Sequence, residues 1–412
     1  MTTYRARVLT PLGPDELRYY DDAIVEIEGG TILAVRAWAG EAVDEDLRPG
    51  VLTPGFVDAH VHYAQTRIIG AAAGPLLEWL ETATFPEEAR FADLDHAQRV
   101  ASVFARSLAA AGTTLAMAWG SVHPHATDAL FQIAEARGQR MMAGPVLMND
   151  HSPADLTWEA HRSLGALDDL ASRWQGRGGL MEVVVLPRFA LSCTRELMAA
   201  AGALAADRGL WVSTHLSENP VEVQIAKERF GAPDYLSIYQ DAGLVHEKSV
   251  YAHCIHLSDD EWGRLAAAGA VVAHCPDSNA FLGSGHMPTA TVLERGIPLA
   301  VGTDVAAGRS FRVPHTLSAA WDNARAQGMM PTVAQLFWWG TRGGALALGH
   351  GELGALQPGL EADMALFEVP PWVEGGRDTA RWMLFTLDGP GAMRTWVRGS
   401  EVWRREPRGL WD

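Results

Sequence analysis

The stretch PGFVDAHVHYAQ, residues 54–65, contains an apolar run that ends in two histidines two positions apart. Residues two apart on a β-strand face the same side, so His60 and His62 would project together from the end of a strand. A second pair of the same spacing, His123 and His125, occurs further along the chain. The position of each pair in the fold must therefore decide which one carries chemistry.

After the first fifty residues, short apolar runs alternate with longer amphipathic stretches, as in the βα units of a parallel sheet. Helices are predicted over 93–111, 194–208 and 258–268, the last with the starting signal Ser258 and Glu261. Eight strands with helical crossovers favour a TIM (β/α)8 barrel, with a doubly wound open sheet as the alternative. The eight runs are VLTPGFVDAHV (51–61), TTLAMAWG (113–120), RMMAGPVLM (140–148), MEVVVLPRF (181–189), LWVSTHL (210–216), SVYAHC (249–254), AVVAHCP (270–276) and PLAVGTD (298–304).

The two ends of the chain have a different pattern. Residues 22–36 alternate around a Gly-Gly turn and residues 394–403 alternate around Gly-Ser, which indicates a β-hairpin at each end. We expect both ends to meet in one small β-sandwich beside the barrel. The predicted domains are therefore 1–53 with 358–412 for the sandwich, and 54–357 for the barrel.

Composition limits the classes of partner. A net charge of −17 disfavours nucleic acid and anionic membranes, both of which require clustered cations, and a small molecule fits better. The N-terminus does not resemble a signal peptide and no apolar run is long enough to span a bilayer, so we expect a cytoplasmic protein. Cys193, Cys254 and Cys275 lack metal-site spacing and are expected to be reduced and buried, with a nucleophilic role for Cys254 or Cys275 as the alternative.

Catalytic residues of such barrels lie at the C-terminal ends of the strands. His60 and His62 pass this test, whereas His123 and His125 follow the second strand and are separated by a proline. We expect His123 and His125 to be a loop or helix-start pair.

The same test selects His215, His253 and Asp304, which end the fifth, sixth and eighth runs. Histidines and a carboxylate at shared strand ends predict a site for zinc or ferrous iron. The fourth run has no lysine that could bridge two metals, which favours a single ion. Glu218, three residues after His215, is the candidate for proton transfer, and a carboxylate that stabilises a helix start is the alternative.

The remaining histidines are assigned by position alone. His274 also ends a strand and is left as a possible supporting residue of the site. Eight further histidines fall in predicted helices or loops and are expected at the surface: His96, His151, His161, His246, His256, His286, His315 and His350.

Seven longer stretches are more specific than the histidine pair. They are HVHYAQ (60–65), LLEWLETATFPEEARF (76–91), PRFALSC (187–193), THLSEN (214–219), AHCIHLSDDEW (252–262), AHCPDSNAFLGSG (273–285) and VGTDVAAGRSF (301–311). Together they resemble the amidohydrolase superfamily over most of residues 50–365. The resemblance implies a metal-dependent hydrolase, usually a homodimer, that deaminates guanine to xanthine and ammonia.

The resemblance also implies roles for individual residues. One zinc ion, or iron as the alternative, would be held by His60, His62, His215 and Asp304. His253 would orient the attacking water together with Asp304, and Glu218 would shuttle protons.

The substrate residues implied by the resemblance also suit a purine chemically. Gln65 offers a donor and an acceptor, Arg188 donates to a carbonyl oxygen, and the Phe189 ring stacks on a flat base. Trp79 is a further candidate for the pocket wall, with a packing role as the alternative.

Two rival functions stay open at this point. A related ring such as 8-oxoguanine, a pterin or an aminotriazine could be the substrate of the same site. A non-catalytic scaffold barrel is the other alternative, although such a protein would be expected to have lost ligands that are all present here. The roles of His274, His286 and Arg309 are left open.

Overall fold

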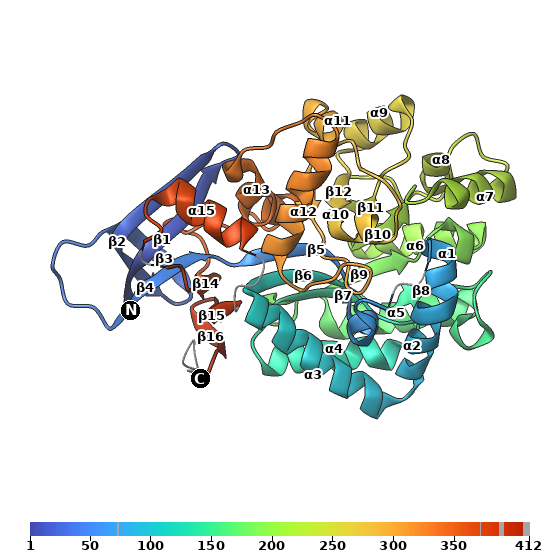
Figure 1. Ribbon diagram of the computed structural model, residues 1–412. Coiled ribbons are helices and arrows are strands. Elements are labelled where there is room, and N and C mark those ends of the chain that lie inside the picture. Colours follow the sequence, from blue (N-terminus) through green and yellow to red (C-terminus); the bar gives the residue numbers. More distant parts are fainter. Residues whose placement is uncertain (72–73, 371, 387–390, 407–412) are drawn as a thin grey trace.

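The computed structural model describes residues 1–71, 74–370, 372–386 and 391–406, which are organised around two separate sheets (Figure 1). The larger sheet is parallel and has the order β5-β6-β7-β9-β10-β11-β12-β13, with β8 paired to β9. Its strands are β5 (Phe56–His62), β6 (Thr113–Trp119), β7 (Met141–Gly144), β8 (Val146–Leu147), β9 (Met181–Pro187), β10 (Trp211–Leu216), β11 (Ser249–His253), β12 (Val271–His274) and β13 (Leu299–Val301). Each of the eight predicted runs contains a strand of this sheet, so the predicted barrel is confirmed.

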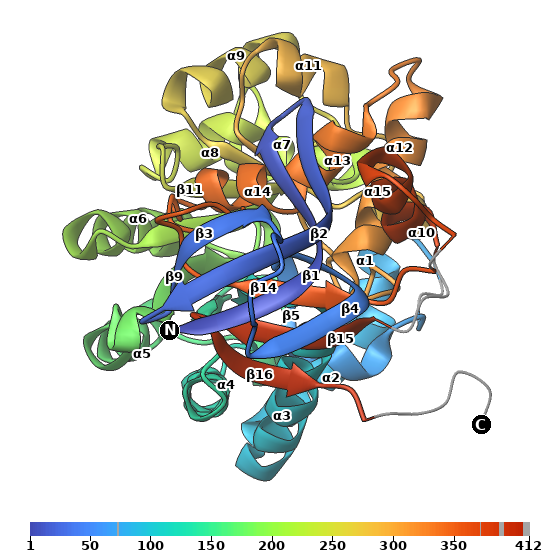
Figure 2. The ribbon, with the colours of Figure 1, turned by 90° about the vertical axis from the view of Figure 1, so that its left-hand side faces the viewer.

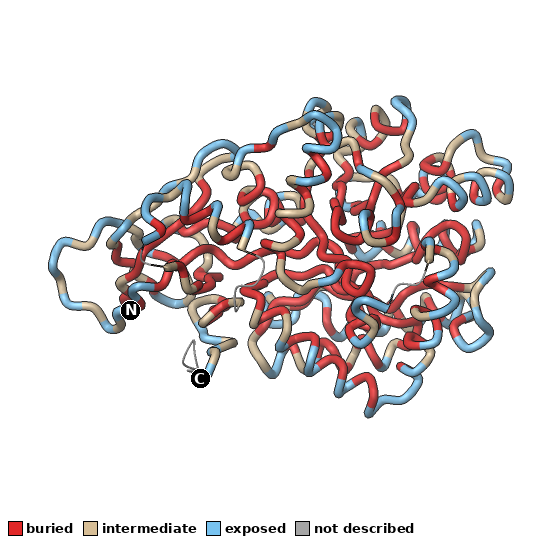
Figure 3. The backbone as a smooth tube through the Cα atoms, in the orientation of Figure 1, coloured by how far each residue is buried: buried red, intermediate tan, exposed pale blue. Residues whose placement is uncertain are grey.

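Helices surround the barrel, and its strands are buried along most of their length (Figure 3). The predicted start of α9 is correct, because Ser258 and Glu261 form a capping box there. The helices that follow barrel strands are α3 (Leu94–Ala111), α4 (Pro124–Ala136), α5 (Ala160–Trp174), α6 (Arg195–Arg208), α7 (Pro220–Phe230), α8 (Tyr235–Asp241), α9 (Asp259–Ala268), α10 (Pro276–Phe281), α11 (Thr289–Glu294), α12 (Val313–Ala326), α13 (Val333–Trp339) and α14 (Arg342–Ala347). Within the described ranges, no helix is long and apolar enough to cross a lipid bilayer.

The barrel closes where the chain after β13 meets β5. The Asp304 N–H donates to the His60 carbonyl at 2.8 Å, and the His62 N–H donates to the Val305 carbonyl at 3.0 Å. Gly302 permits this approach, because a Cβ there would lie 2.6 Å from the His60 Cβ. Closure rules out the open doubly wound sheet.

The second sheet is built from both ends of the chain and has seven strands in the order β16-β15-β14-β4-β1-β2-β3 (Figure 2). Its pairs are antiparallel except β1 with β4, which are parallel. The strands are β1 (Thr2–Gly13), β2 (Glu16–Glu28), β3 (Thr31–Ala37), β4 (Glu45–Pro54), β14 (Met364–Phe367), β15 (Ala392–Val397) and β16 (Ser400–Arg404). Both predicted hairpins are present, as β2 with β3 and β15 with β16.

The terminal sheet has a small apolar core of its own, which includes Val8, Val25 and Trp396. Helix α15 (Gly376–Phe385) packs against α12, α13 and β2 and so joins the two parts of the molecule. We propose the domain limits 1–53 with 358–412 and 54–357. The end of β4 at Pro54 and the start of β5 at Phe56 support the first limit.

A buried ion pair ties the barrel to the terminal sheet. Arg140, just before β7, donates from Nε to Asp363 Oδ2 at 2.8 Å, and their side chains are 2% and 1% exposed. Arg140 also pairs with Glu361. The Asp363 carbonyl accepts the Gly55 N–H at 3.0 Å, at the junction between β4 and β5. The pair therefore lies where the chain passes from one sheet to the other.

Replacing Arg140 by Met should lower the free energy of unfolding by about 3 to 5 kcal/mol, because the Asp363 charge would stay buried without its cation. Denaturant titration measures this change. Arg177→Met is the control, since the side chains of the Arg177–Glu135 pair are 50% and 41% exposed, and exposed pairs contribute about 1 kcal/mol or less. Equal losses in the two variants would contradict the prediction.

Candidate metal and substrate site

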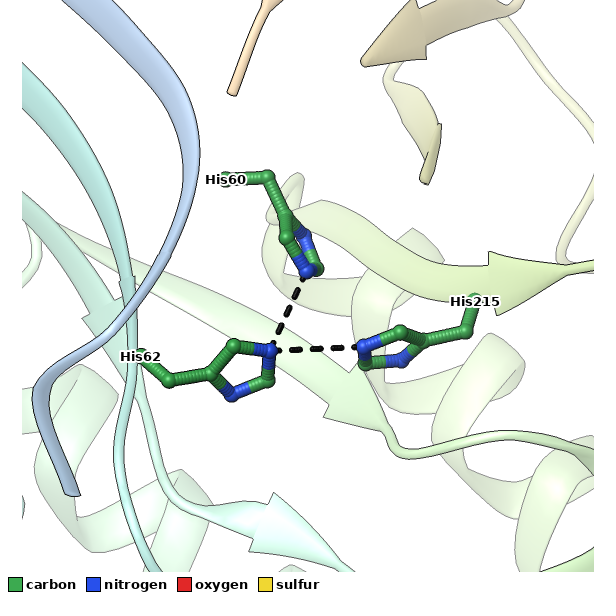
Figure 4. A group of neighbouring side chains, drawn as sticks. All are labelled: His60, His62 and His215. Carbon is green, nitrogen blue, oxygen red and sulfur yellow. Dashed lines mark hydrogen bonds between the residues drawn. The ribbon is translucent and has the colours of Figure 1, made fainter. Parts of the chain in front are cut away.

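The predicted polar residues of four strand ends meet at one end of the barrel. His60 and His62 end β5, His215 lies on β10, and Figure 4 shows the three rings pointing toward one another. Nε2 of His62 lies 3.1 Å from Nε2 of His60 and 3.4 Å from Nε2 of His215. Asp304, after β13, brings Oδ1 to 3.4 Å from His60 Nε2 and 3.2 Å from His62 Nε2.

Burial favours the neutral form of His60 and His215. It lowers the pKa of His60 to about 4 and the pKa of His215 well below its usual value. His215 Nδ1 donates to the Arg188 carbonyl at 2.6 Å, so its Nε2 carries the lone pair that faces the cluster. Burial opposes ionisation of Asp304, but the neighbouring His60 and His62 hold the pKa of its carboxyl well below the usual range.

This donor set fits a divalent metal ion. The ligand atoms of His60, His62 and His215 lie within 4.8 Å of one another, and so do those of His60, His253 and Asp304. Several nitrogen lone pairs and a carboxylate oxygen directed at one point repel each other unless a cation lies between them. Imidazole and carboxylate ligands suit zinc and ferrous iron alike.

His253 ends β11, and its ring stacks beside that of His215 at a centroid distance of 5.4 Å. Its Nδ1 donates to Asn279 Oδ1 at 2.8 Å, and its Nε2 lies 3.4 Å from Glu218 Oε2 and 3.9 Å from Asp304 Oδ2. Burial works against a charged ring, but the nearby Glu218 and Asp304 carboxylates raise the pKa of His253. Positive φ angles of 72° at His253 and 49° at Asp304 show that both side chains are held in backbone conformations that L residues rarely adopt.

Glu218 is buried next to His253 and does not cap a helix. The Ser284 hydroxyl donates to Glu218 Oε1 at 3.1 Å. Burial raises the pKa of Glu218 to about 7, so its carboxyl can change protonation state near neutral pH. Helix α7 is capped instead by Asn219 and Glu222, which excludes the simple capping alternative for Glu218.

Two residues of this site were not predicted from the sequence. Asn279 fixes the ring of His253, and Ser284 holds Glu218; both belong to the stretch that follows β12. The only signal in the sequence was the AHCPDSNAFLGSG motif, in which both residues occur. Asn and Ser are common in turns and short loops whatever their task, and only the pairing of β12 with β11 and of β11 with β10 brings this stretch close to His253 and Glu218.

A cavity opens beside the metal cluster. Its polar wall includes His62, His215, Glu218, His253 and Asp304, and its apolar wall includes Leu76, Leu80, Leu282 and Ala307. All four predicted substrate residues line the same cavity: Gln65, Trp79, Arg188 and Phe189. The cavity therefore combines a metal-ligand cluster, a titratable carboxyl and a flat apolar surface.

Trp79 comes from a helical segment that covers the cavity. This segment runs through α1 (Leu76–Trp79), the π-helix η2 (Leu80–Thr84) and α2 (Phe85–Ala89). Trp79 is 3% exposed and lines the cavity, so it contributes to the wall as well as to packing.

The other histidines lie outside this cavity. His123 precedes α4 and His125 lies in its first turn, as the helix-start prediction requires. His274 is fully buried, and neither ring nitrogen has a hydrogen-bond partner among the described residues. The surface prediction for His96 is wrong: it is 5% exposed on the inner face of α3, with Nε2 3.1 Å from Glu87 Oε1.

The seven other histidines predicted at the surface are exposed or half-buried: His151, His161, His246, His256, His286, His315 and His350. Arg309 pairs with the buried Asp277 and does not line the cavity. The three cysteines are buried free thiols, and burial raises the pKa of Cys254 and Cys275 well above the usual range. A nucleophilic thiolate at either position is therefore disfavoured.

This chain is similar to known proteins in both sequence and fold. The model of the amidohydrolase family matches residues 51–399. Guanine deaminase from Escherichia coli K12 is 36% identical over 94% of this chain and 93% of its own, and a probable guanine deaminase from Deinococcus radiodurans is 36% identical over 98% and 99%. The E. coli guanine deaminase structure superposes with a TM-score of 0.94 at 32% identity, covering 98% of this chain and all of that one. Guanine deaminase from C. acetobutylicum, solved with guanine bound in the active site, gives 0.92 at 26% identity over the same shares. This chain belongs to the amidohydrolase family.

Proposed function

We propose that this chain hydrolyses guanine to xanthine and ammonia in guanine catabolism. The observation that carries the proposal is the shared cavity, which is lined by Arg188, Gln65 and Phe189. Its lining also includes Glu218 and the metal ligands His62, His215 and Asp304. Near-full-length similarity to guanine deaminases supports the same substrate. As an amidohydrolase, the enzyme acts on the C–N bond of a cyclic amidine.

The metal ligands in this proposal are His60, His62, His215 and Asp304, and the ion is a single zinc. The convergence of their ring nitrogens and one carboxylate oxygen supports it. When bound, the metal supplies Lewis acidity that activates water at neutral pH. Iron stays the alternative to zinc, and a homodimeric assembly and a cytoplasmic location stay predictions.

The protein residues divide the proton transfers between them. Glu218 takes a proton from the attacking water and gives it to the ring nitrogen beside C2. His253, with its ring fixed by Asn279, and Asp304 hold the water oxygen as it adds to C2. The bond between C2 and the exocyclic nitrogen then breaks, and that nitrogen leaves as ammonia after a second protonation. Water supplies the oxygen of xanthine, so no redox partner is consumed.

The remaining residues that line the cavity bind the base. Arg188 donates to a carbonyl oxygen of guanine, Gln65 hydrogen-bonds its polar rim, and the Phe189 ring stacks on its face. Trp79, Leu76 and Leu80 close the apolar side and keep bulk water from the reacting atoms. These contacts suit an uncharged, flat heterocycle that carries both a carbonyl and an amino group.

The purified enzyme should release ammonia from guanine with stoichiometric formation of xanthine, and a chelator should abolish turnover until zinc is restored. Guanine loss measured by absorbance, with metal analysis of the same samples, tests this. A panel of 8-oxoguanine, a pterin and an aminotriazine should give lower kcat/KM. Turnover of one of these rings without turnover of guanine would contradict the proposed substrate, and a folded, metal-free and inactive protein would favour the scaffold alternative.

Glu218→Gln should reduce kcat by about 10²- to 10⁴-fold while the metal content stays unchanged, because the proton shuttle is lost and the ligands are kept. Steady-state kinetics and metal analysis measure the two effects. Glu222→Gln is a control for loss of support in the same turn. Glu222 is fully buried and accepts the Tyr235 hydroxyl and the backbone N–H groups of Glu218 and Asn219, and its replacement leaves the Glu218 carboxyl in place. Full activity of Glu218→Gln would remove this residue from the mechanism.

The pH profile should show an acid limb set by Glu218. The Glu218 carboxyl accepts a proton only when it is ionised. The value of kcat/KM should therefore be high above the pKa of Glu218 and should fall as the pH decreases through that pKa. Burial raises this pKa to about 7, and a nearby cation shifts it downward, so the limb is expected at or below pH 7. A profile that is flat through the acid range while the metal stays bound would contradict this role.

A further inference from the structure

A buried carboxylate lies directly behind the substrate wall. Glu88, in α2, is fully buried and does not line the cavity. Its Oε1 accepts from Gln65 Nε2 at 3.0 Å and its Oε2 accepts from Arg188 Nη1 at 2.7 Å. One side chain thus contacts two residues that line the cavity. It lies within the TFPEEARF stretch, to which no role has yet been assigned.

Glu88 leaves the amide of Gln65 a single orientation. A carboxylate only accepts and a backbone N–H only donates, and Gln65 lies between one of each. Nε2 faces Glu88, and Oε1 accepts the Ala306 N–H at 3.3 Å. Rotating the amide by half a turn would set donor against donor at Ala306 and acceptor against acceptor at Glu88. The group that the amide offers to the base is therefore determined by Glu88.

Glu88 also cancels the charge of Arg188. The Arg188 side chain is 3% exposed, and Glu88 is its ion-pair partner in the described part of the chain. The guanidinium has five N–H donors, and most of them are left for the cavity that it lines. Because the pair is neutral overall, it donates to a carbonyl oxygen without attracting an anion strongly.

We propose that Glu88 is a positioning residue that orients Gln65 and Arg188, and that its charge makes the site favour a neutral carbonyl-bearing base over an anionic ring. The inference rests on the proposed function. Xanthine is more acidic than guanine and becomes an anion at mildly alkaline pH, so the same charge balance promotes release of the product.

The neighbouring Glu87 provides a matched control. Consecutive residues of a helix point about 100° apart, so Glu87 faces away from the cavity. It is 6% exposed and contacts Arg67, Arg90 and His96. Both carboxylates are buried, belong to the same helix and are paired with cations, but only Glu88 contacts residues that line the cavity.

The test compares Glu88→Gln, Glu88→Asp and Glu87→Gln in the metal-loaded enzyme. For Glu88→Gln, kcat/KM on guanine should fall about 10- to 100-fold, mainly through KM, with unchanged metal content. Inhibition by xanthine at alkaline pH should become stronger, because Arg188 loses its counter-charge. Glu88→Asp keeps the charge but is shorter, so KM should rise while xanthine inhibition stays at the wild-type level. Glu87→Gln should match the wild type in both measurements.

A merely structural role would weaken guanine and xanthine binding together, so parallel weakening in Glu88→Gln would overturn the inference. An unchanged KM for guanine in Glu88→Gln would overturn the inference as well. So would an equal loss of kcat/KM in Glu87→Gln. If Glu88→Gln does not fold, Glu88→Asp decides: a wild-type KM there contradicts the positioning role. Guanine turnover by the wild type is measured first. No turnover by the wild type would contradict the proposed function, whereas wild-type turnover with the variant results named above would contradict only the role of Glu88.

Discussion

The hydrogen bonds between the first and last barrel strands are the constraint on which the site depends. Asp304 belongs to the chain after β13 and His60 to β5, and the 2.8 Å bond between their backbones fixes the distance between the two ligands. Asp58 strengthens the same seam, because its carboxylate accepts the Thr303 N–H at 2.9 Å as well as the Thr303 hydroxyl. In an open sheet, the same residues would lie on opposite edges, and no metal-ligand set would exist.

The barrel and the metal-ligand cluster could be predicted from the sequence because both follow from the periodicity of the strands and the position of their ends. Eight apolar runs indicated the barrel, and the polar residues at their ends indicated His60, His62, His215, His253 and Asp304 without any knowledge of contacts. The roles of the residues that support this cluster could not be predicted from the sequence, because they depend on contacts between distant segments. Residues of this kind are Asp58, Glu88, Asn279 and Ser284, each an ordinary polar residue in the sequence. His96 was misplaced for a different reason, because it was assigned to the surface as a helical histidine although it shares the apolar face of α3 with Val100 and Phe104.

Three buried carboxyl groups of the site have different surroundings, and each environment matches a task. Asp304 is surrounded by imidazoles and stays ionised, as a ligand must. Glu88 is balanced by Arg188, which forms a rigid and uncharged unit behind the substrate wall. Among the described residues, Glu218 has no cation of its own nearer than the His253 ring, so burial raises its pKa to about 7 and leaves it able to exchange a proton. The same residue type therefore acts as a ligand, a support or a proton carrier according to what surrounds it.

The terminal sheet has a consequence for the order in which the molecule can be assembled. Strand β4 precedes the barrel and β14 follows it, yet the two pair side by side, with Leu52 opposite Leu366. During synthesis from the N-terminus, β4 therefore leaves the ribosome long before its partner exists. Its unpaired N–H and C=O groups form an open edge throughout the synthesis of the barrel, and such an edge can pair with another chain. Docking of β14 covers this edge of β4, and β16 and β3 become the outer strands of the completed sheet. The sheet that the first strands begin is therefore completed only when the last strands of the chain have been made.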